Sequence, residues 1–154
     1  MAEEFLETRA DKFVFRVKKG LFYSSQGCWI ALDGDKATIG VTDFQQKVSG
    51  DMVFIEMIES GSRITQGEPM GQIETIKVSI ELASPVSGIV EEVNDLLSEK
   101  PELINEDPFG QGWIYRVRGE NLVEETRGLM TDADYFELMK GMIKGELDRI
   151  KGGT

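Results

Sequence analysis

The sequence predicts a mostly β fold, a compact barrel or flattened sandwich with small peripheral helices. Apolar and polar residues alternate in short runs such as 13–17 and 37–41, and this alternation is typical of half-buried strands. Glycines and a proline, including Gly61, Gly67 and Pro69, separate such runs at short intervals. Closely spaced turn residues of this kind suit a barrel or sandwich of short strands.

The length of 154 residues indicates one folded domain, which we place at 12–154. Residues 1–11 are polar and acidic, and we expect a loosely held N-terminal arm with a short helix. No apolar run approaches the roughly 20 residues of a membrane span, and no signal pattern opens the chain. We therefore expect a cytoplasmic protein with no membrane partner. The single cysteine, Cys28, permits no internal disulfide and agrees with a reducing compartment.

The charge balance narrows the classes of partner. With 17 basic and 28 acidic residues the formal net charge is −11, which disfavours nucleic acid because its phosphates would be repelled. The charge would favour encounters with basic patches around enzyme active sites, although solubility explains it equally well. The chain has no histidine, so it contains no imidazole base and no histidine metal ligand. No catalytic or metal-binding constellation is visible, and we expect a protein that is not itself an enzyme.

The first half of the chain contains a strand, a hairpin and a short helix. The strand at 13–17 ends near Gly20, and a hairpin follows over 29–41, with Asp33-Gly34-Asp35 at its turn. Thr42 and Gln45 form a capping-box pattern in which Thr42 accepts from the amide at 45 and the Gln45 side chain reaches back.

The helix opened by this box is expected to end at Gly50. The segment 51–58, apolar on both phases apart from Glu56, predicts a largely buried strand.

The second half continues the sheet and ends in a helix. Residues 89–93 read as a strand, Asn94-Asp95 as a cap for a short helix, 101–108 as mainly turn, and 112–117 as the last clear strand. A C-terminal helix over 131–151 begins at Thr131, with Asp134 in the position of the box carboxylate. Its apolar stripe, expected to pack on the barrel, consists of Tyr135, Leu138, Met139, Met142, Ile143, Leu147 and Ile150.

A slip in the apolar pattern singles out Lys77. Ile73 lies on odd positions, whereas Ile76 and Val78 lie on even ones, so the chain must bend or turn between residues 73 and 77. Lys77 then lies at or beside a hairpin tip, where an amine is well placed to carry a covalently attached group. On periodicity alone, however, a lysine on the solvent face of a strand is the ordinary interpretation.

The residues around Lys77 resemble the lipoyl-lysine hairpin of the glycine cleavage H-protein family. Glu74-Thr-Ile-Lys-Val78 is followed by Ala83-Ser-Pro-Val-Ser-Gly88, and the Ala-Met-Lys-Met signature of biotinyl domains is absent. The resemblance implies that lipoic acid is attached to Lys77 through an amide. It also implies that Glu74 and Gly88, three residues before and eleven after the lysine, are used by the lipoylating enzyme, a lipoate ligase or a lipoyl/octanoyl transferase.

The resemblance extends over residues 23–145 and implies a fold. This fold is the barrel-sandwich hybrid of the lipoyl/biotinyl type, with the C-terminal helix packed on the barrel. Further matching segments are 37–44, 50–56, 101–110, 112–114 and Asp134-Tyr135.

One segment departs from the family pattern. Family members read Tyr-Thr-x-Glu-His-Glu-Trp where this chain reads Tyr23-Ser-Ser-Gln-Gly-Cys-Trp29, so Gly27 replaces the histidine and Cys28 a glutamate. The resemblance places both positions on the surface that handles the amine-bearing intermediate. Both residues are therefore candidate contacts of the lipoyl arm. Cys28 has two interpretations, a half-buried packing residue or a thiol that exchanges with the sulfurs of the arm.

These observations lead to three functional hypotheses. In the first, the protein is a non-catalytic lipoyl carrier of the H-protein-like kind found in heterodisulfide-reductase-like sulfur oxidation. Its partners would then be a heterodisulfide-reductase-like complex and a dihydrolipoamide dehydrogenase. The replacement of the family histidine and glutamate by Gly27 and Cys28 favours this first hypothesis. The first alternative is a glycine cleavage carrier of the aminomethyl group, working with glycine decarboxylase, aminomethyltransferase and the same dehydrogenase. In the second alternative, Lys77 stays unmodified and the chain is a binding or scaffold module.

Overall fold

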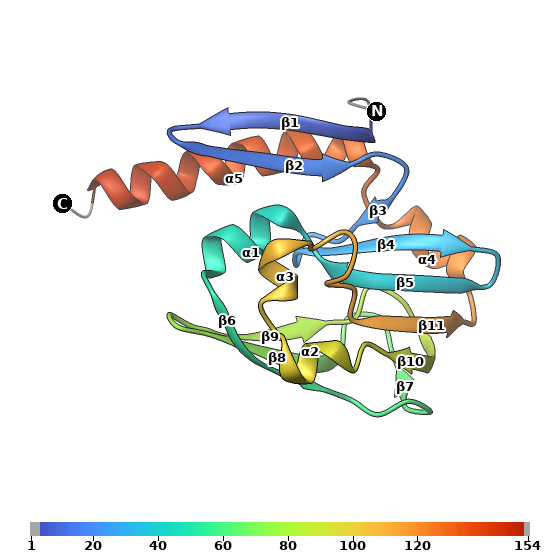
Figure 1. Ribbon diagram of the computed structural model, residues 1–154. Helices are drawn as coiled ribbons and strands as arrows, with labels where there is room; N and C mark the ends of the chain where they lie inside the picture. The colour runs from blue at the N-terminus through green and yellow to red at the C-terminus, as the bar shows by residue number, and fades with distance from the viewer. Residues whose placement is uncertain (1–3, 153–154) are drawn as a thin grey trace.

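The computed structural model describes residues 4–152, with side chains described as far as Glu146. Two antiparallel sheets form the body and a separate hairpin lies beside them (Figure 1). The larger sheet has the order β3-β4-β5-β11-β10-β7 and the smaller one the order β6-β8-β9. The larger sheet contains β3 (Phe22–Tyr23), β4 (Cys28–Asp33), β5 (Lys36–Val41), β11 (Tyr115–Gly119), β10 (Gly88–Val93) and β7 (Arg63–Ile64); the smaller contains β6 (Met52–Met57), β8 (Pro69–Thr75) and β9 (Ser79–Ala83).

The main core draws its residues from both sheets. Ile39 and Val117 belong to the larger sheet, Ile55 and Ile73 to the smaller one, and all four are almost completely buried in one apolar cluster. Burying the apolar faces of two sheets against each other is what holds a sandwich together. The predicted mostly β fold with peripheral helices is therefore confirmed.

The expectation of a helical N-terminal arm is wrong for the residues that the structure describes. Strand β1 (Phe5–Ala10) pairs in antiparallel register with β2 (Phe13–Lys18), and Asp11 adopts a left-handed φ of 56° in the turn. Leu6, Thr8 and Ala10 are partly covered while the residues between them are exposed. This two-residue period was present in the sequence, but the surrounding charges obscured it.

The C-terminal helix α5 (Asp132–Gly152) lies along the β1–β2 hairpin (Figure 1). The helix predicted over 131–151 is thus present, and it contacts β1, β2 and β3. Tyr135 stacks on Tyr23 with ring centroids 4.7 Å apart, and Leu138 is the member of the predicted stripe that remains exposed. Side chains of the stripe members Leu147 and Ile150 lie outside the described residues. A second core forms here from Phe15, Val17, Tyr23, Trp29, Phe44, Tyr135, Met139 and Ile143.

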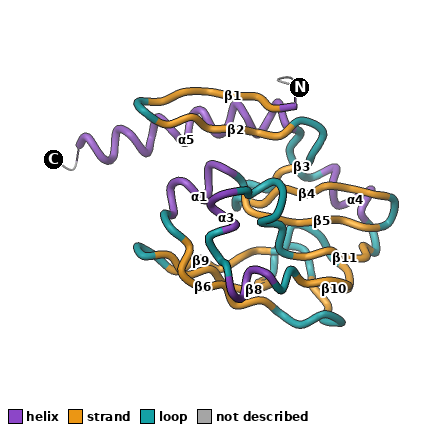
Figure 2. Tube along the Cα trace, in the orientation of Figure 1, coloured by secondary structure: helices purple, strands orange, loops and turns teal. Residues whose placement is uncertain are grey.

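Besides α5, the described residues form four short helices around the sheets. Figure 2 draws helices in purple. The helix α1 follows β5 and is capped by Thr42 and Gly50. The segment 101–108, expected to be mainly turn, contains a one-turn helix, and another helix follows β11 without having been predicted. The helices are α1 (Asp43–Ser49), α2 (Leu96–Glu99), α3 (Leu103–Glu106) and α4 (Leu122–Arg127).

Strand β6 differs from its prediction as a largely buried strand. Val53 is 56% exposed and Phe54 51% exposed, while Ile55 is buried. The strand lies at the edge of the three-stranded sheet, so one side of its backbone and several apolar side chains are uncovered. Among the described helices, none is long and apolar enough to cross a membrane.

Candidate functional site: the lysine hairpin

Lys77 lies in the turn between β8 and β9, at a tip that extends from the body (Figure 1). Thr75 holds the turn closed. Its amide donates to the Val78 carbonyl over 2.8 Å, and its Oγ1 accepts from the amides of Lys77 and Val78 at 3.1 and 3.0 Å. The reversal accounts for the slip in the apolar pattern, because Ile73 is buried and Ile76 is 71% exposed.

The Lys77 side chain lies back against the end of α1. Its Nζ donates to the Val48 carbonyl oxygen over 3.0 Å, and the contact is exposed to solvent. Val48 is in the last turn of α1, where carbonyl groups lack intrahelical partners and attract cations. The amine is therefore accessible at the surface, and acylation would remove the charge that favours this contact.

Helix α1 begins as predicted but its capping box is incomplete. Thr42 Oγ1 accepts from the Gln45 amide at 3.1 Å, and the helix ends at Gly50, whose amide donates to the Gln46 carbonyl. The Gln45 side chain does not reach back, because its Nε2 donates to Ser49 Oγ at 2.9 Å. The predicted reciprocal bond is therefore wrong, and the Gln45 side chain instead bridges one turn of α1.

Glu74 and Gly88 occupy different environments. Glu74 is exposed on β8, opposite Phe54 and Ser79, and in the described part of the chain its carboxylate has no ion-pair or hydrogen-bond partner. Gly88 is buried at the start of β10 in the other sheet, paired with Gly119. The fold therefore places Glu74 on the lysine hairpin and leaves Gly88 within the larger sheet, between β11 and β7.

Gly27 and Cys28 are both buried. Gly27 has a φ of 95°, and a Cβ there would lie 2.6 Å from Gln45 Oε1. Burial raises the pKa of the Cys28 thiol to about 12, so the thiol stays protonated at neutral pH. The burial of both residues and the raised pKa of the thiol disfavour a contact with the lipoyl arm. Cys28 fits the interpretation as a packing residue, and it is completely buried where we expected half-burial.

Four exposed apolar side chains near the tip escaped the sequence analysis as a group. Ile76 and Val78 flank Lys77 in the turn, and Val53 and Phe54 lie on the neighbouring strand, where Phe54 is paired with Glu74. For Val53 and Phe54, the sequence signal was the run of consecutive apolar residues in 51–58. We interpreted this run as a strand buried on both faces, but these two side chains are exposed. No group of three or more Cys, Asp or Glu side chains in the described part of the chain is placed to hold a metal ion.

Comparison with known proteins places the chain in a family. The family model described as "Glycine cleavage H-protein" matches residues 21–142. The chain belongs to the glycine cleavage H-protein family. It is 44% identical over 119 residues to the glycine cleavage system H protein of Rubrobacter xylanophilus, covering 77% of this chain and 91% of that protein. The probable H protein of Pyrococcus abyssi is 40% identical over 129 residues, covering 83% and 96%.

The three-dimensional comparison agrees with this assignment. The crystal structure of a glycine cleavage system H protein from Mycobacterium marinum matches with a TM-score of 0.71 and 30% identity, covering 77% of this chain and 95% of that one. Members of this H-protein family are non-catalytic lipoyl carriers with lipoate attached covalently to a lysine, and this chain is such a carrier. The relatives are named for glycine cleavage, so the comparisons support that alternative better than the sulfur-oxidation hypothesis.

Proposed function

We propose that the protein is the lipoyl carrier of a glycine cleavage system and that Lys77 is the lipoylated residue. Lipoate amide-linked to Lys77 would supply a disulfide that can accept the aminomethyl carbon and the electron pair left when glycine loses its carboxyl group as carbon dioxide. Glycine decarboxylase would load the arm, and aminomethyltransferase would pass the carbon to its own acceptor and release the amine. A dihydrolipoamide dehydrogenase would then reoxidise the dithiol. A lipoate ligase or lipoyl transferase attaches the arm, and Glu74 is the exposed carboxylate beside the lysine that it recognises.

The exposed position of Lys77 on a hairpin tip carries this proposal. The lipoyl amide and the lysine side chain together span about a dozen bonds, which gives a reach on the order of 10 Å or more. Tethering makes each handover quasi-intramolecular, with effective concentrations around millimolar. A tip fixed by Thr75 gives the arm a rigid base, and the surrounding apolar side chains offer contact surface to the enzymes that it visits.

A second candidate, carriage of sulfur intermediates, is favoured by the residues at positions 27 and 28. The family histidine and glutamate are replaced by Gly27 and Cys28, which are both buried, so this chain offers an aminomethyl cargo no polar side chain from either position. Reconstitution separates the candidates. The lipoylated protein, mixed with glycine, glycine decarboxylase, aminomethyltransferase with its one-carbon acceptor, and the dehydrogenase, should support glycine-dependent reduction of the dehydrogenase's electron acceptor. Lipoylated protein that is inactive in this mixture would favour the second candidate.

Intact mass tests the modification itself. Protein from a lipoylation-competent host should show a lipoyl adduct that Lys77→Arg abolishes. Substituting Glu74 by glutamine should impair lipoylation more than thermal stability, because this exposed carboxylate has no partner among the described residues. An unmodified wild-type chain in such a host would instead support a binding or scaffold module.

A further inference from the structure

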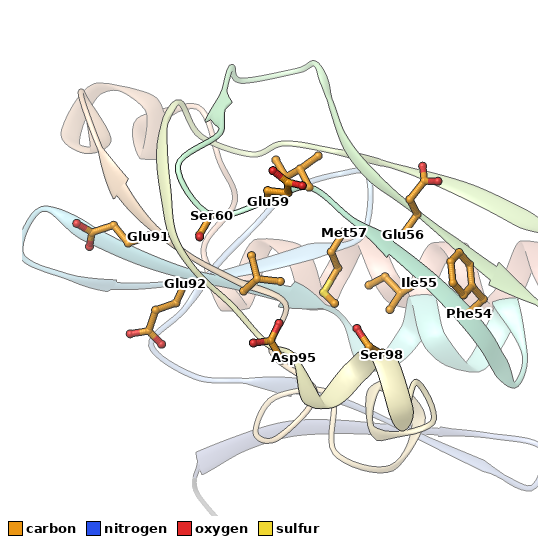
Figure 3. Close-up of a pocket in the computed structure, with 12 residues that line it drawn as sticks. Phe54, Ile55, Glu56, Met57, Glu59, Ser60, Glu91, Glu92, Asp95 and Ser98 are labelled. Atoms are coloured by element: carbon orange, nitrogen blue, oxygen red, sulfur yellow. The ribbon is translucent and has the colours of Figure 1, made fainter.

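A groove separate from the contact between Lys77 and α1 runs along the outer side of β6 (Figure 3). It has a volume of about 860 Å³ and lies between β6 with the loop that follows it, α2 and the end of β10. Asp95 and Ser98 approach it from α2, and Ile55 and Met57 point toward them from β6 (Figure 3). The groove is therefore walled by two segments that are distant in sequence, residues 54–60 and residues 91–98.

The backbone of β6 forms one wall of the groove. Residues 54–60 all line it, although successive side chains of a strand point to opposite faces. Consecutive residues can share one groove where the edge of the strand faces it. In the described part of the chain β6 pairs with β8 alone, so its second edge has no strand partner. Such an edge is a template for another extended segment.

The charge of the groove is uniformly negative. Its lining contains five carboxylates and no lysine or arginine. Glu91 pairs with Arg118 at 2.7 Å, and Glu92 pairs with Arg116 at 2.9 Å. Within the described residues no cation lies within ion-pair distance of Glu56, Glu59 or Asp95. These three charges are available to a positively charged partner.

Apolar side chains supply the remaining lining. Ile55 is buried, and Met57, Ile58 and Val93 are partly exposed within the groove. Phe54 is 51% exposed and lies opposite Glu74. Glu74 is three residues before Lys77. A segment held in the groove would thus lie next to the lysine hairpin. Its side chains would have to be basic toward the carboxylates and apolar toward the floor, as in an extended segment with alternating residue types.

We propose that this groove binds an extended, lysine- or arginine-bearing segment of a partner protein, which adds as a strand to the free edge of β6. The backbone edge supplies hydrogen bonds, the apolar floor supplies contact area, and the three unpaired carboxylates select for positive charge. The groove is present in the protein before lipoate is attached. It depends neither on the nature of the cargo nor on attachment of lipoate at Lys77.

A synthetic peptide tests the proposal on the full-length protein. The probe is an acetylated, amidated peptide of four Lys-Val repeats, and the readout is the amide NMR shift of isotope-labelled protein at low salt. We expect saturable shifts centred on residues 54–60, and binding that weakens as salt is added, because these exposed charges are screened. A Glu-Val peptide should not bind, and N-methylation of alternate amides should weaken the Lys-Val peptide at least tenfold because it blocks strand pairing.

Two matched variants locate the charge effect. Glu59→Lys, in the groove, should weaken peptide binding about fivefold, whereas Glu68→Lys, exposed in the loop before β8, should leave it within twofold. Absence of binding, equal effects of the two variants, or equal binding of the N-methylated peptide would each overturn the proposal. Two further outcomes would overturn it. Loss of peptide binding on lipoylation would assign the groove to the protein's own lipoyl arm. Concentration-dependent dimerisation that covers β6 would assign the groove to a second copy of the chain.

Discussion

Replacing Gly88 by alanine separates two roles for this glycine, backbone packing and recognition during lipoylation. A Cβ at position 88 would lie 2.1 Å from the Arg118 carbonyl oxygen, 2.9 Å from its carbonyl carbon and 3.0 Å from the Gly119 Cα. These are backbone atoms of the paired strand β11, so they cannot rotate away as a flexible side chain would. Overpacking of this kind costs about 1–3 kcal/mol. For a chain of this length that corresponds to a loss in Tm of roughly 3–10 °C.

Thermal unfolding and a lipoylation assay on the same variant distinguish the roles. We expect Gly88→Ala to melt at lower temperature than wild type, yet to be lipoylated at the wild-type rate well below its Tm. Gly141→Ala is the matched control, because a Cβ there meets nothing within 4 Å inside a helix and should add up to about 1 kcal/mol. An unchanged Tm combined with slow lipoylation of Gly88→Ala would refute the packing argument.

Three further substitutions test the cores and the caps. Thr42→Ala removes the bond to the Gln45 amide and the 3.0 Å contact with the Tyr135 hydroxyl, so urea unfolding should show a loss of about 1–2 kcal/mol. Phe15→Ala should lose about 3–5 kcal/mol in the same measurement, because it empties a buried position of the second core. Burial on folding raises the pKa of the Cys28 thiol from 9.0 to about 12, so the free energy of unfolding should fall as pH rises between these values. Cys28→Ala should flatten the first part of that decline, and an identical decline in the variant would contradict the assignment.

Local chemistry explains the elements that could be predicted from the sequence. The Gly34 turn, the Thr42 cap and the Gly50 helix end each depend on a few neighbouring residues, and all three are present. Strand β1 was missed because its charged residues suggested a solvated arm, although they alternate with residues that α5 and β2 cover. Its stability comes from tertiary contacts with the C-terminal helix, which no local pattern reports.

The site was predictable only in part, for a similar reason. The bend before Lys77 follows from the side-chain period of a strand, so the slip after Ile73 reveals it. The exposure of Phe54 depends on β6 being at the edge of a sheet, and strand order is set by topology rather than by periodicity. The burial of Cys28 likewise depends on how β4 packs in the main core. The side-chain period therefore located the bend beside Lys77, the family resemblance assigned the arm to this lysine, and neither indicated the surfaces around it.

The N-terminal hairpin is joined to the helix on which Lys77 rests. Residues 5–18 precede the family match, which begins at residue 21. The Arg16 amide of β2 donates to Asp43 Oδ2 at 2.9 Å, and Lys47 Nζ contacts both Asp43 and the Val14 carbonyl. These bonds hold α1 against β2 at Asp43 in its first turn and at Lys47 in its last turn, and the last turn also accepts the Lys77 amine. The extension thus holds in place the helix against which the Lys77 side chain lies.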